Sequence, residues 1–369
     1  MRSLQTLYIV LRNKNRHELR LLNLSISSSH LRRTLLFALV TLLPSAAQTV
    51  NVRESDPVYM PGGVDSNSPV WWSDAGFRML NSTGYSLLST GPNQFSFDRT
   101  EWVDGLQMRH LPFWMEAVWK DPDGVLFGWY HHEPGGLCAN GLTSPEIGAA
   151  VSFDDGVTWQ DMGIVMTAAD PIDCNAKNGF FAGGHGDFSV VTDRAGAYLY
   201  FIFGNYGGPV EAQGLAMARM AVSERWGPAG AVWKWRDGAW SEPGLGGLVT
   251  PIAPAKVAWQ QSKTDSFWGP SLHFNTHLNA FVMLMSRSCC DERWPQEGIY
   301  ISFNRFIGNP NGWSEPKKII DNVGYGPGWY PQVIGVEEGE TDTRAGRKAR
   351  LYIHGISYWE LEFDRTPAQ

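Results

Sequence analysis

The sequence repeats one unit five times, and this repeat restricts the fold more than any other feature. Each unit has a polar or aromatic anchor, a short apolar run, a polar turn and a second apolar run rich in aromatic residues. The anchors are Asp65, Glu116, Asp187, Trp268 and Tyr330, which stand about 51, 71, 81 and 62 residues apart. Units of this size are typical of the blades of a β-propeller, in which each unit folds as a small sheet.

The way in which the units continue predicts four strands in each blade. The three middle units add a further strand and then a turn that contains tryptophan, at residues 158–161, 240–243 and 313–316. The last unit ends one strand short, and Thr49–Val52 can supply that strand and close the ring, which removes exposed strand edges. We therefore predict an all-β, five-bladed β-propeller with four-stranded blades. A β-sandwich with long insertions is the alternative.

The composition supports this fold class and excludes two others. The 40 Gly and 22 Pro residues place turns too often for long helices. With 13% aromatic and only 18% charged residues, the chain cannot be disordered. The formal net charge of −7 leaves no basic face to neutralise phosphates, so we expect no binding to nucleic acid.

The N-terminal region is typical of a secretory signal. An apolar run at residues 35–43 follows Arg32 and Arg33 and precedes the small residues of Ser45–Ala47. The run is too short to span a bilayer. We expect residues 1–47 to be a signal peptide with an upstream extension, and residues 48–369 to form a single propeller domain that is secreted or periplasmic.

Export would place the four cysteines in a compartment where disulfides persist. Cys138 and Cys174 lie in Gly- and Asn-rich loop sequence and could pair with each other. Cys289 and Cys290 are adjacent, and they either form a vicinal bridge or remain free. Because the sequence has no Cys-x-x-Cys pair, it gives no support to a zinc site.

One short motif is specific enough to be assigned from the sequence. Ser152–Trp159 matches Ser-x-Asp-x-Gly-x-Thr-Trp, the Asp box of sialidases and related propellers. The motif builds a turn, with an Asp that bonds backbone amides and a Trp that packs under the blade, so we place it on the face away from the chemistry. A sialidase is the weaker functional alternative, because it requires an arginine triad and usually several such boxes.

Three of the anchors carry carboxylates. In a propeller the innermost strand of each blade begins on the same face near the axis, so Asp65, Glu116 and Asp187 should converge there. Crowded carboxylates in a partly desolvated mouth raise the pKa of at least one member. Two carboxyl groups on either side of a glycosidic bond are what hydrolysis requires.

Two of these anchors carry a resemblance to a known group. His185–Tyr200 resembles the Asp-containing inner strand of the arabinanase, β-xylosidase and invertase group of five-bladed propeller glycoside hydrolases, and Asp65–Pro69 resembles the first-blade Asp motif of that group. The resemblance implies that Asp65 is the base or nucleophile and that Asp187 orients substrate and tunes the pKa of the acid.

The expected acid is missing from its place. Phe267–Ser271 is similar to the Glu-Gly-Pro segment of the group, but Trp268 stands where the group has its Glu. We therefore predict Glu116 as the acid, with Glu133 and Glu297 as alternatives at strand ends that should face the same mouth.

Other residues are predicted to contact the substrate. Histidines could bond sugar hydroxyls, an arginine could bind a carboxylate or a pair of hydroxyls, and tryptophans could stack on sugar rings. The set is His131, His132, Glu133, His185, Trp268, His273, Arg287, Glu297 and Trp329. We expect no required cofactor and no catalytic metal. The pattern leaves room for an axial structural cation such as calcium, which His273 would help to hold.

The sequence thus predicts a secreted, monomeric glycoside hydrolase that acts on a plant or microbial polysaccharide or oligosaccharide by carboxylate acid/base catalysis. The alternative from another class is a non-catalytic carbohydrate-binding propeller, whose carboxylates and aromatic rings bind sugars without cleaving them.

Overall fold

The computed structural model describes residues 6–12, 19–25, 47–106, 110–292, 295–321 and 328–366. The chain divides into two units, the second of which is Gln48–Asp364. In the first unit, β1 (Thr6–Arg12) and β2 (Leu19–Ser25) pair as an antiparallel hairpin. The predicted signal sequence at residues 35–43 lies outside the described residues. Among the residues described, no helix has the length and apolar character needed to cross a membrane.

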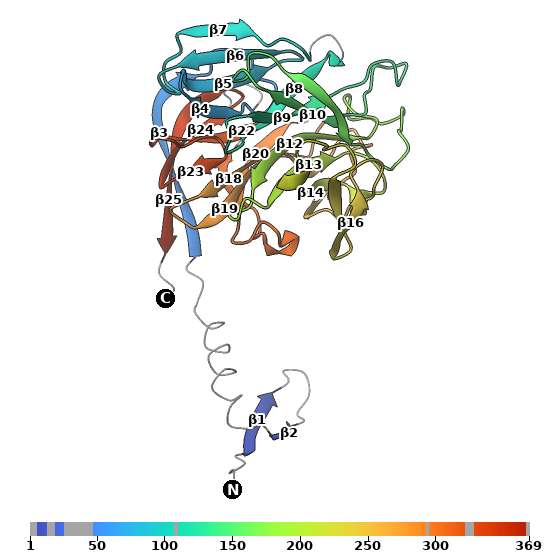
Figure 1. Cartoon of the computed structure of the whole chain (residues 1–369). Helices are drawn as coiled ribbons and strands as arrows, with labels where there is room; N and C mark the ends of the chain where they lie inside the picture. Colours follow the sequence, from blue (N-terminus) through green and yellow to red (C-terminus); the bar gives the residue numbers. More distant parts are fainter. Residues whose placement is uncertain are drawn as a thin grey trace. The chain divides into compact units, whose positions relative to one another are not determined.

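The second unit is a five-bladed β-propeller, as predicted, and not a β-sandwich (Figure 1). Blade 1 holds β4 (Val70–Ser73), β5 (Gly76–Ser82), β6 (Ser86–Gly91) and β7 (Arg99–Trp102). Blade 2 holds β8 (Phe113–Lys120), β9 (Leu126–His132), β10 (Glu146–Ser152) and β11 (Gln160–Met166). Blade 3 holds β12 (His185–Thr192), β13 (Tyr198–Asn205), β14 (Gly214–Ala221), β15 (Val232–Arg236), β16 (Ala239–Pro243) and the short β17 (Ala253–Pro254).

Blade 4 holds β18 (Ser266–Asn275), β19 (Ala280–Ser288), β20 (Gln296–Asn304), β21 (Lys317–Asp321) and the short β23 (Arg344–Ala345). Blade 5 holds β22 (Pro331–Gly335), β24 (Lys348–Ile353), β25 (Ile356–Thr366) and β3 (Ala47–Tyr59). Three single-turn 3-10 helices lie in the connections, at Val210–Ala212, Val222–Glu224 and Pro310–Gly312.

The ring closes as the sequence predicted. Strand β3 completes blade 5 by lying beside β25, and the two strands are adjacent in Figure 1. Thr49 Oγ1 donates to the carbonyl of Asp364 (3.3 Å), and Arg53 pairs with Glu362 (2.6 Å). This joins the first and last strands of the unit, so that β25 is enclosed between β24 and β3 and β3 forms the outer edge of blade 5.

Blade 3 differs from the prediction. The segment at residues 240–243 was expected to be a turn, but it belongs to β16, which pairs antiparallel with β15 as a fifth strand. Asp237 and Gly238, both with positive φ, form the tight turn between these two strands.

The Asp box builds the turn between β10 and β11 of blade 2. This turn lies on the face of the propeller where the inner strand β8 ends. Asp154 makes the turn by accepting Thr158 N–H and Oγ1 (2.9 and 2.6 Å). Asp155, at φ 60°, instead bridges to blade 1, where its carboxylate accepts from Trp71 Nε1 and pairs with Arg78 (both 2.9 Å). The box therefore joins two blades as well as turning the chain.

Hydrogen bonds between side chains and backbone link the blades around the axis, and five of them connect the five pairs of neighbouring blades. They join Met115 N–H to Ser82 Oγ (3.1 Å), Phe188 N–H to Glu116 Oε2 (2.7 Å), Leu272 N–H to Ser189 Oγ (3.1 Å), Ser271 Oγ to the carbonyl of Pro331 (2.6 Å), and Ser68 N–H to Gln332 Oε1 (2.8 Å). Each pair of neighbouring blades thus has at least one such link, and Glu116 provides a link between blades 2 and 3.

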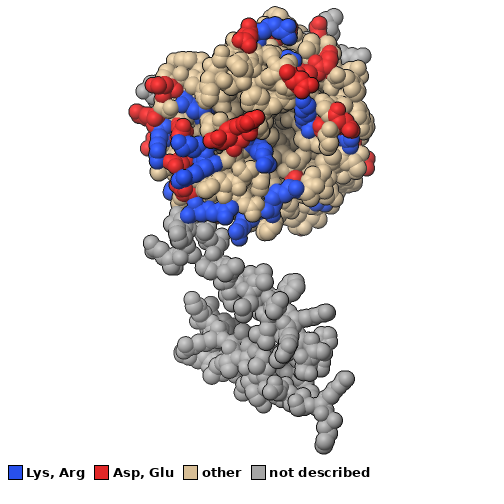
Figure 2. Space-filling view, turned by 60° about the vertical axis from the view of Figure 1, so that its left-hand side comes forward, with Lys and Arg blue, Asp and Glu red and all other residues tan. Residues whose placement is uncertain are grey.

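Disulfides join Cys138 to Cys174 and Cys289 to Cys290, so none of the four cysteines is free. On the face drawn in Figure 2, acidic and basic side chains are interspersed, and the surface is hollowed near its middle.

Candidate active site

A cavity of about 140 Å³ lies at the end of the axis where the inner strands begin. Its wall contains the carboxylates of Asp65, Glu116, Glu133 and Asp187, contributed by blades 1, 2 and 3. The rest of the wall is His131 and six aromatic residues, Trp114, Phe180, Phe181, Trp268, Trp329 and Tyr330. The three anchors that were predicted to converge therefore line one cavity.

Irregular backbone turns these side chains toward the axis. Strand β12 has a bulge between Gly186 and Phe188, and the residue between them, Asp187, has φ 44°. Strand β8 has a bulge at the level of Glu116, between Met115 and Ala117. A bulge leaves one residue unpaired and re-aims its side chain, and this is how two carboxylates leave the ordinary alternation of their strands.

His131 connects two of the carboxylates. Its Nδ1 lies 3.3 Å from Glu116 Oε1 and its Nε2 lies 3.2 Å from Glu133 Oε1. Burial favours the neutral imidazole, but the hydrogen bonds and charges of Glu116 and Glu133 raise the pKa of His131 well above its ordinary value. The two glutamates thus favour the protonated form of His131, whose Nδ1 also lies 3.2 Å from the backbone nitrogen of Asp187.

The two glutamates differ in pKa because their surroundings differ. For Glu133, the hydrogen bonds from His131 and from Thr143 Oγ1 (3.1 Å) outweigh burial and lower the pKa. For Glu116, which is 2% exposed, burial dominates and the pKa is raised despite His131 and the Phe188 amide. Glu133 is thus ionised at neutral pH and retains access to the cavity, whereas Glu116 is enclosed.

Asp187 is buried beside this group. Burial, with the charges of Glu116 and Glu133, raises the pKa of Asp187 to about 6, although His131 and a hydrogen bond from the Tyr206 hydroxyl oppose the rise. That hydrogen bond fixes the carboxyl group, because Tyr206 is itself fully buried against the Trp259 ring.

Among the carboxyl groups of the cavity whose pKa is raised, Asp65 is the most exposed. It precedes β4, and its backbone N–H donates to the carbonyl of Ser82 (2.8 Å). Burial, followed by the charges of Asp187 and Glu133, raises the pKa of Asp65 to about 6, while the nearby indole of Trp114 opposes this rise. The cavity therefore combines a carboxyl group, Asp65, that keeps its proton to about pH 6 with a carboxyl group, Glu133, that loses its proton at a lower pH.

Aromatic rings form the opposite wall. Trp268 packs edge-on against Trp329 (5.7 Å between ring centroids) and Tyr330 (5.6 Å), and its indole N–H donates to Ser288 Oγ (2.8 Å). Trp268 and Trp329 were predicted to stack on sugar, and both line the cavity.

Three of the predicted histidines do not line the cavity. His132 is at the end of β9, where its Nδ1 contacts the carbonyl of Pro112 (3.0 Å). His185 is buried and lies 2.9 Å from Lys234 Nζ. His273 is also buried, packs against the Phe363 ring, and has no hydrogen-bond partner for either ring nitrogen among the described residues.

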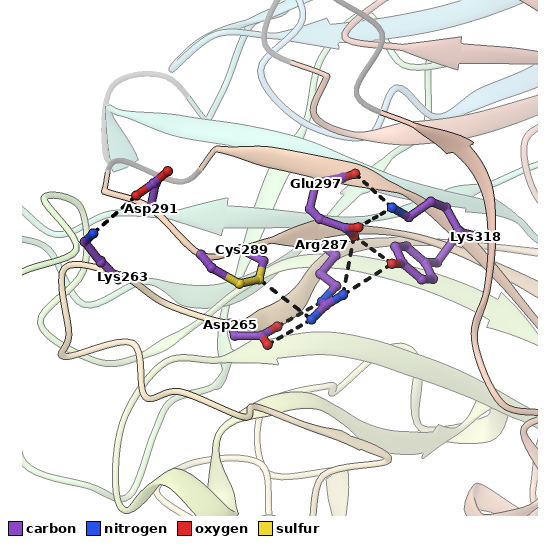
Figure 3. The surroundings of a disulfide bond; sticks show 9 residues. Lys263, Asp265, Arg287, Cys289, Asp291, Glu297 and Lys318 are labelled. Carbon is purple, nitrogen blue, oxygen red and sulfur yellow. Dashed lines mark hydrogen bonds and ion pairs between the residues drawn. A yellow bond between two sulfur atoms is a disulfide. The ribbon is translucent and has the colours of Figure 1, made fainter.

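Arg287 and Glu297 also lie outside the cavity, in an ion-pair network beside the Cys289–Cys290 disulfide (Figure 3). Arg287 pairs with Asp265 (2.8 Å) and Glu297 (3.5 Å), and Lys318 also pairs with Glu297. Neither residue lines the cavity, and the charges of both are paired with neighbouring side chains.

Several lining residues were not predicted as site residues. Trp114 precedes Glu116 by two positions on β8, so strand alternation could have suggested it. Tyr330 is an anchor of the repeat, which is the same signal that identified Asp65. Phe180 and Phe181 lie in a loop, and no pattern in the sequence indicates where this loop folds; the same holds for Tyr206, which does not line the cavity but bonds to Asp187.

The donor atoms of Glu116, His131 and Asp187 lie within 4.8 Å of one another, close enough to share a metal ion. This set does not match the expected calcium, which prefers six to eight oxygen ligands. Asp265 also lies near Cys289 and Cys290, but the disulfide between these cysteines leaves no thiolate to bind a metal.

No protein-family model matches the chain, and no curated protein sequence matches it. Among solved structures, the chain is similar to an α-L-arabinanase of Cellvibrio cellulosa in complex with arabinohexaose, at 10% identity over 82% of this chain and 92% of that chain, with a TM-score of 0.47. It is also similar to a thermostable family-43 glycoside hydrolase (12% identity, 84% and 92% covered, TM-score 0.48). A third similar structure is the catalytic domain of the GH62 α-L-arabinofuranosidase of Coprinopsis cinerea (10% identity, 86% and 97% covered, TM-score 0.46). This likeness is one of fold.

Proposed function

We propose that this protein is a glycoside hydrolase that uses two carboxyl groups of the cavity as acid and base. The observation that supports this best is the opposite shift of two accessible carboxyl groups in one cavity. The pKa of Asp65 is raised to about 6, mainly by burial, and that of Glu133 is lowered by the hydrogen bond from His131. Titratable groups whose pKa values are driven apart are what acid/base catalysis uses.

The roles differ from those suggested by the sequence. Asp65 keeps its proton longer and becomes the acid, while Glu133 becomes the base or nucleophile. Glu116 is unsuited to give a proton, because it is 2% exposed, and its two oxygens are held by His131 and the Phe188 amide. We assign Glu116 and His131 as positioning residues that keep Glu133 ionised, and Asp187 as the buried carboxyl group that raises the pKa of Asp65.

In the proposed reaction, Asp65 transfers its proton to the glycosidic oxygen as the bond to the anomeric carbon breaks. Glu133 either removes a proton from the attacking water or attacks the anomeric carbon itself, in which case water releases the sugar in a second step. The first route inverts the anomeric configuration and the second retains it, so the product's configuration distinguishes them.

The size of the cavity favours a single sugar ring. Its volume of about 140 Å³ is close to the roughly 150 Å³ that accommodates one benzene molecule in an engineered protein cavity. Trp329, which is half-buried, offers an aromatic face to the apolar side of such a ring, and the buried Trp268 packs edge-on against it. We therefore propose cleavage of terminal sugars from an oligosaccharide or polysaccharide. The two disulfides support a secreted or periplasmic location.

The test is sugar release from a panel of aryl glycosides and of oligosaccharides from arabinan, xylan, fructan and galactan. Wild-type protein should release a monosaccharide from one of them, and Asp65→Asn and Glu133→Gln should each lower that rate by about 10²–10⁴-fold. Glu297→Gln is the matched control, because this carboxylate lies outside the cavity, and its rate should equal that of the wild type.

A non-catalytic carbohydrate-binding propeller is the second candidate, favoured by Trp268 at the place where the resembling enzymes carry a Glu. Folded protein that retains a glycan on an array and releases no sugar from any substrate would support it and reject hydrolysis. The sialidase alternative has no further support, because no arginine of the described chain lines the cavity.

A further inference from the structure

A second and larger cavity lies at the other end of the propeller axis. Its volume is about 690 Å³, and all five blades contribute to its wall. Trp72, Lys120, Thr192 and Phe274 lie at or near the ends of the inner strands that begin at the smaller cavity. On β12, Asp187 and Thr192 are five residues apart, which corresponds to about 16 Å along a strand. The two cavities are therefore separate.

The charge of this cavity is opposite to that of the chain. Lys120, Arg194 and Arg344 line it, and in the part of the chain that the structure describes none of the three forms an ion pair. Lys120 Nζ donates to the carbonyl of Trp72 (3.1 Å), and Arg194 donates to Asn279 Oδ1 (2.9 Å), so several N–H groups of each are left for a ligand.

The nearby carboxylates lower the net charge of the cavity without cancelling it, because one lining carboxylate stands against three lining cations. Asp193 also lines the cavity, but its Oδ1 accepts the backbone N–H of Ala197 (2.8 Å) in the turn after β12. Glu340 is near enough to Arg344 to feel its charge, yet its Oε2 accepts the Glu337 N–H (3.0 Å). In a protein with a formal net charge of −7, a cavity with three cations and one engaged carboxylate attracts anions.

Aromatic rings and hydroxyl groups complete the wall. Trp72 and Trp119 are half-buried, and the Trp72 indole is fixed by donating to the carbonyl of Glu340 (2.8 Å). Thr192, Thr341 and Thr343 bring hydroxyl groups to the same space. A cavity of about 690 Å³ lies within the range of roughly 300–1,000 Å³ that suits ligands of several rings, and it is much larger than an inorganic anion needs.

We propose that this cavity binds an acidic oligosaccharide, with carboxylates on Lys120, Arg194 and Arg344 and sugar rings on Trp72 and Trp119. Guanidinium groups bind carboxylates in a bidentate manner, and indole faces accept the apolar faces of sugars. The site would hold the protein on a uronic acid-containing polysaccharide, and it does not depend on the hydrolysis proposed above.

The test is calorimetric titration of the full chain with a uronic acid tetrasaccharide at low salt, alongside its methyl ester and inorganic phosphate. The tetrasaccharide should bind, and its methyl ester, which lacks the charges, should bind at least tenfold more weakly. The triple variant Lys120→Gln, Arg194→Gln and Arg344→Gln should lose at least tenfold in affinity. These three side chains are exposed, so the variant should unfold at the same urea concentration as the wild type.

Matched controls separate this site from general charge and from the smaller cavity. The triple variant Lys256→Gln, Arg236→Gln and Lys263→Gln removes the same charge elsewhere and should bind as the wild type does, and so should Asp65→Asn. No binding of the tetrasaccharide, equal binding by the Lys120, Arg194 and Arg344 variant, equal affinity for phosphate, or loss of binding in Asp65→Asn would each overturn the proposal.

Discussion

Replacement of Glu116 distinguishes the two roles that this residue could have. Loss of a positioning residue should slow all substrates equally, whereas loss of a proton donor should slow mainly substrates with a poor leaving group. In Glu116→Ala, the Phe188 N–H and His131 Nδ1 lose the carboxylate that they contact at 2.7 and 3.3 Å. Loss of one partner from a buried ion pair costs about 3–5 kcal/mol. Because His131 keeps Glu133 as a second partner, we expect the free energy of unfolding to fall by about 3 kcal/mol, near the lower end of that range.

Glu116→Gln is the milder variant. Its amide oxygen can still accept the Phe188 N–H, so only the charge opposite His131 is lost, at a cost of about 1–2 kcal/mol. With one negative neighbour fewer, the pKa of His131 should fall, and Glu133 should then lose part of its protection against protonation. We therefore expect the low-pH limb of kcat/KM to move to higher pH in Glu116→Gln.

The assays are urea unfolding and turnover on two aryl glycosides, one with a good and one with a poor leaving group. As a positioning residue, Glu116 should affect both substrates by the same factor. If Glu116→Gln abolished turnover only of the substrate with the poor leaving group, at unchanged stability, Glu116 would be the acid and the assignment to Asp65 would be wrong.

Three further outcomes follow from the contacts described. Burial raises the pKa of Asp65 to about 6. We therefore expect kcat/KM to fall as the pH rises through about 6, because the protonated form that donates to the substrate is lost there. In a pH–rate profile, Asp65→Asn should lack this limb. Asp187→Asn should preserve the melting temperature within a few degrees and lower kcat by orders of magnitude, because it removes a charge without opening a cavity; unchanged kinetics would remove Asp187 from the site. In urea unfolding, Asp154→Ala should cost about 1 kcal/mol, like a lost cap, and Asp155→Ala about 1.5–3 kcal/mol, since it removes the charged partner of buried Arg78. Both Asp box variants should keep full activity per folded molecule. A loss of turnover at unchanged stability would show that the box lies on the same face as the active site.

The fold was predictable because the repeat is visible in the sequence. The anchor spacing predicts five blades, and the missing strand of the last blade predicts closure by β3. The fifth strand of blade 3 was not predictable, because Trp240–Pro243 carries the same Trp-x-x-Pro pattern as a true turn in blade 4.

The site was predictable only where strand starts determine position. Asp65, Glu116 and Asp187 share one cavity because inner strands begin on one face. The exchange of roles between Glu116 and Glu133 depends on the bulge in β8 and on the orientation of His131, and a shift of one residue turns a side chain to the opposite face of its sheet. Arg287 and Glu297 also stand at strand ends, but pairing with Asp265 and Lys318 holds them away from the cavity, and spacing alone does not reveal such partners.

The most direct test of the central claim is chemical rescue of Glu133→Ala on an aryl glycoside that the wild type cleaves. If Glu133 is the base or nucleophile, the variant should turn over slowly, and added azide should restore turnover by taking the place of the carboxylate or the water and giving a glycosyl azide. Asp65→Asn should not form this product from a substrate with a poor leaving group, because proton donation is then what is missing. Wild-type turnover in Glu133→Ala, or an impaired variant that azide does not restore, would contradict the assignment of this cavity as the active site.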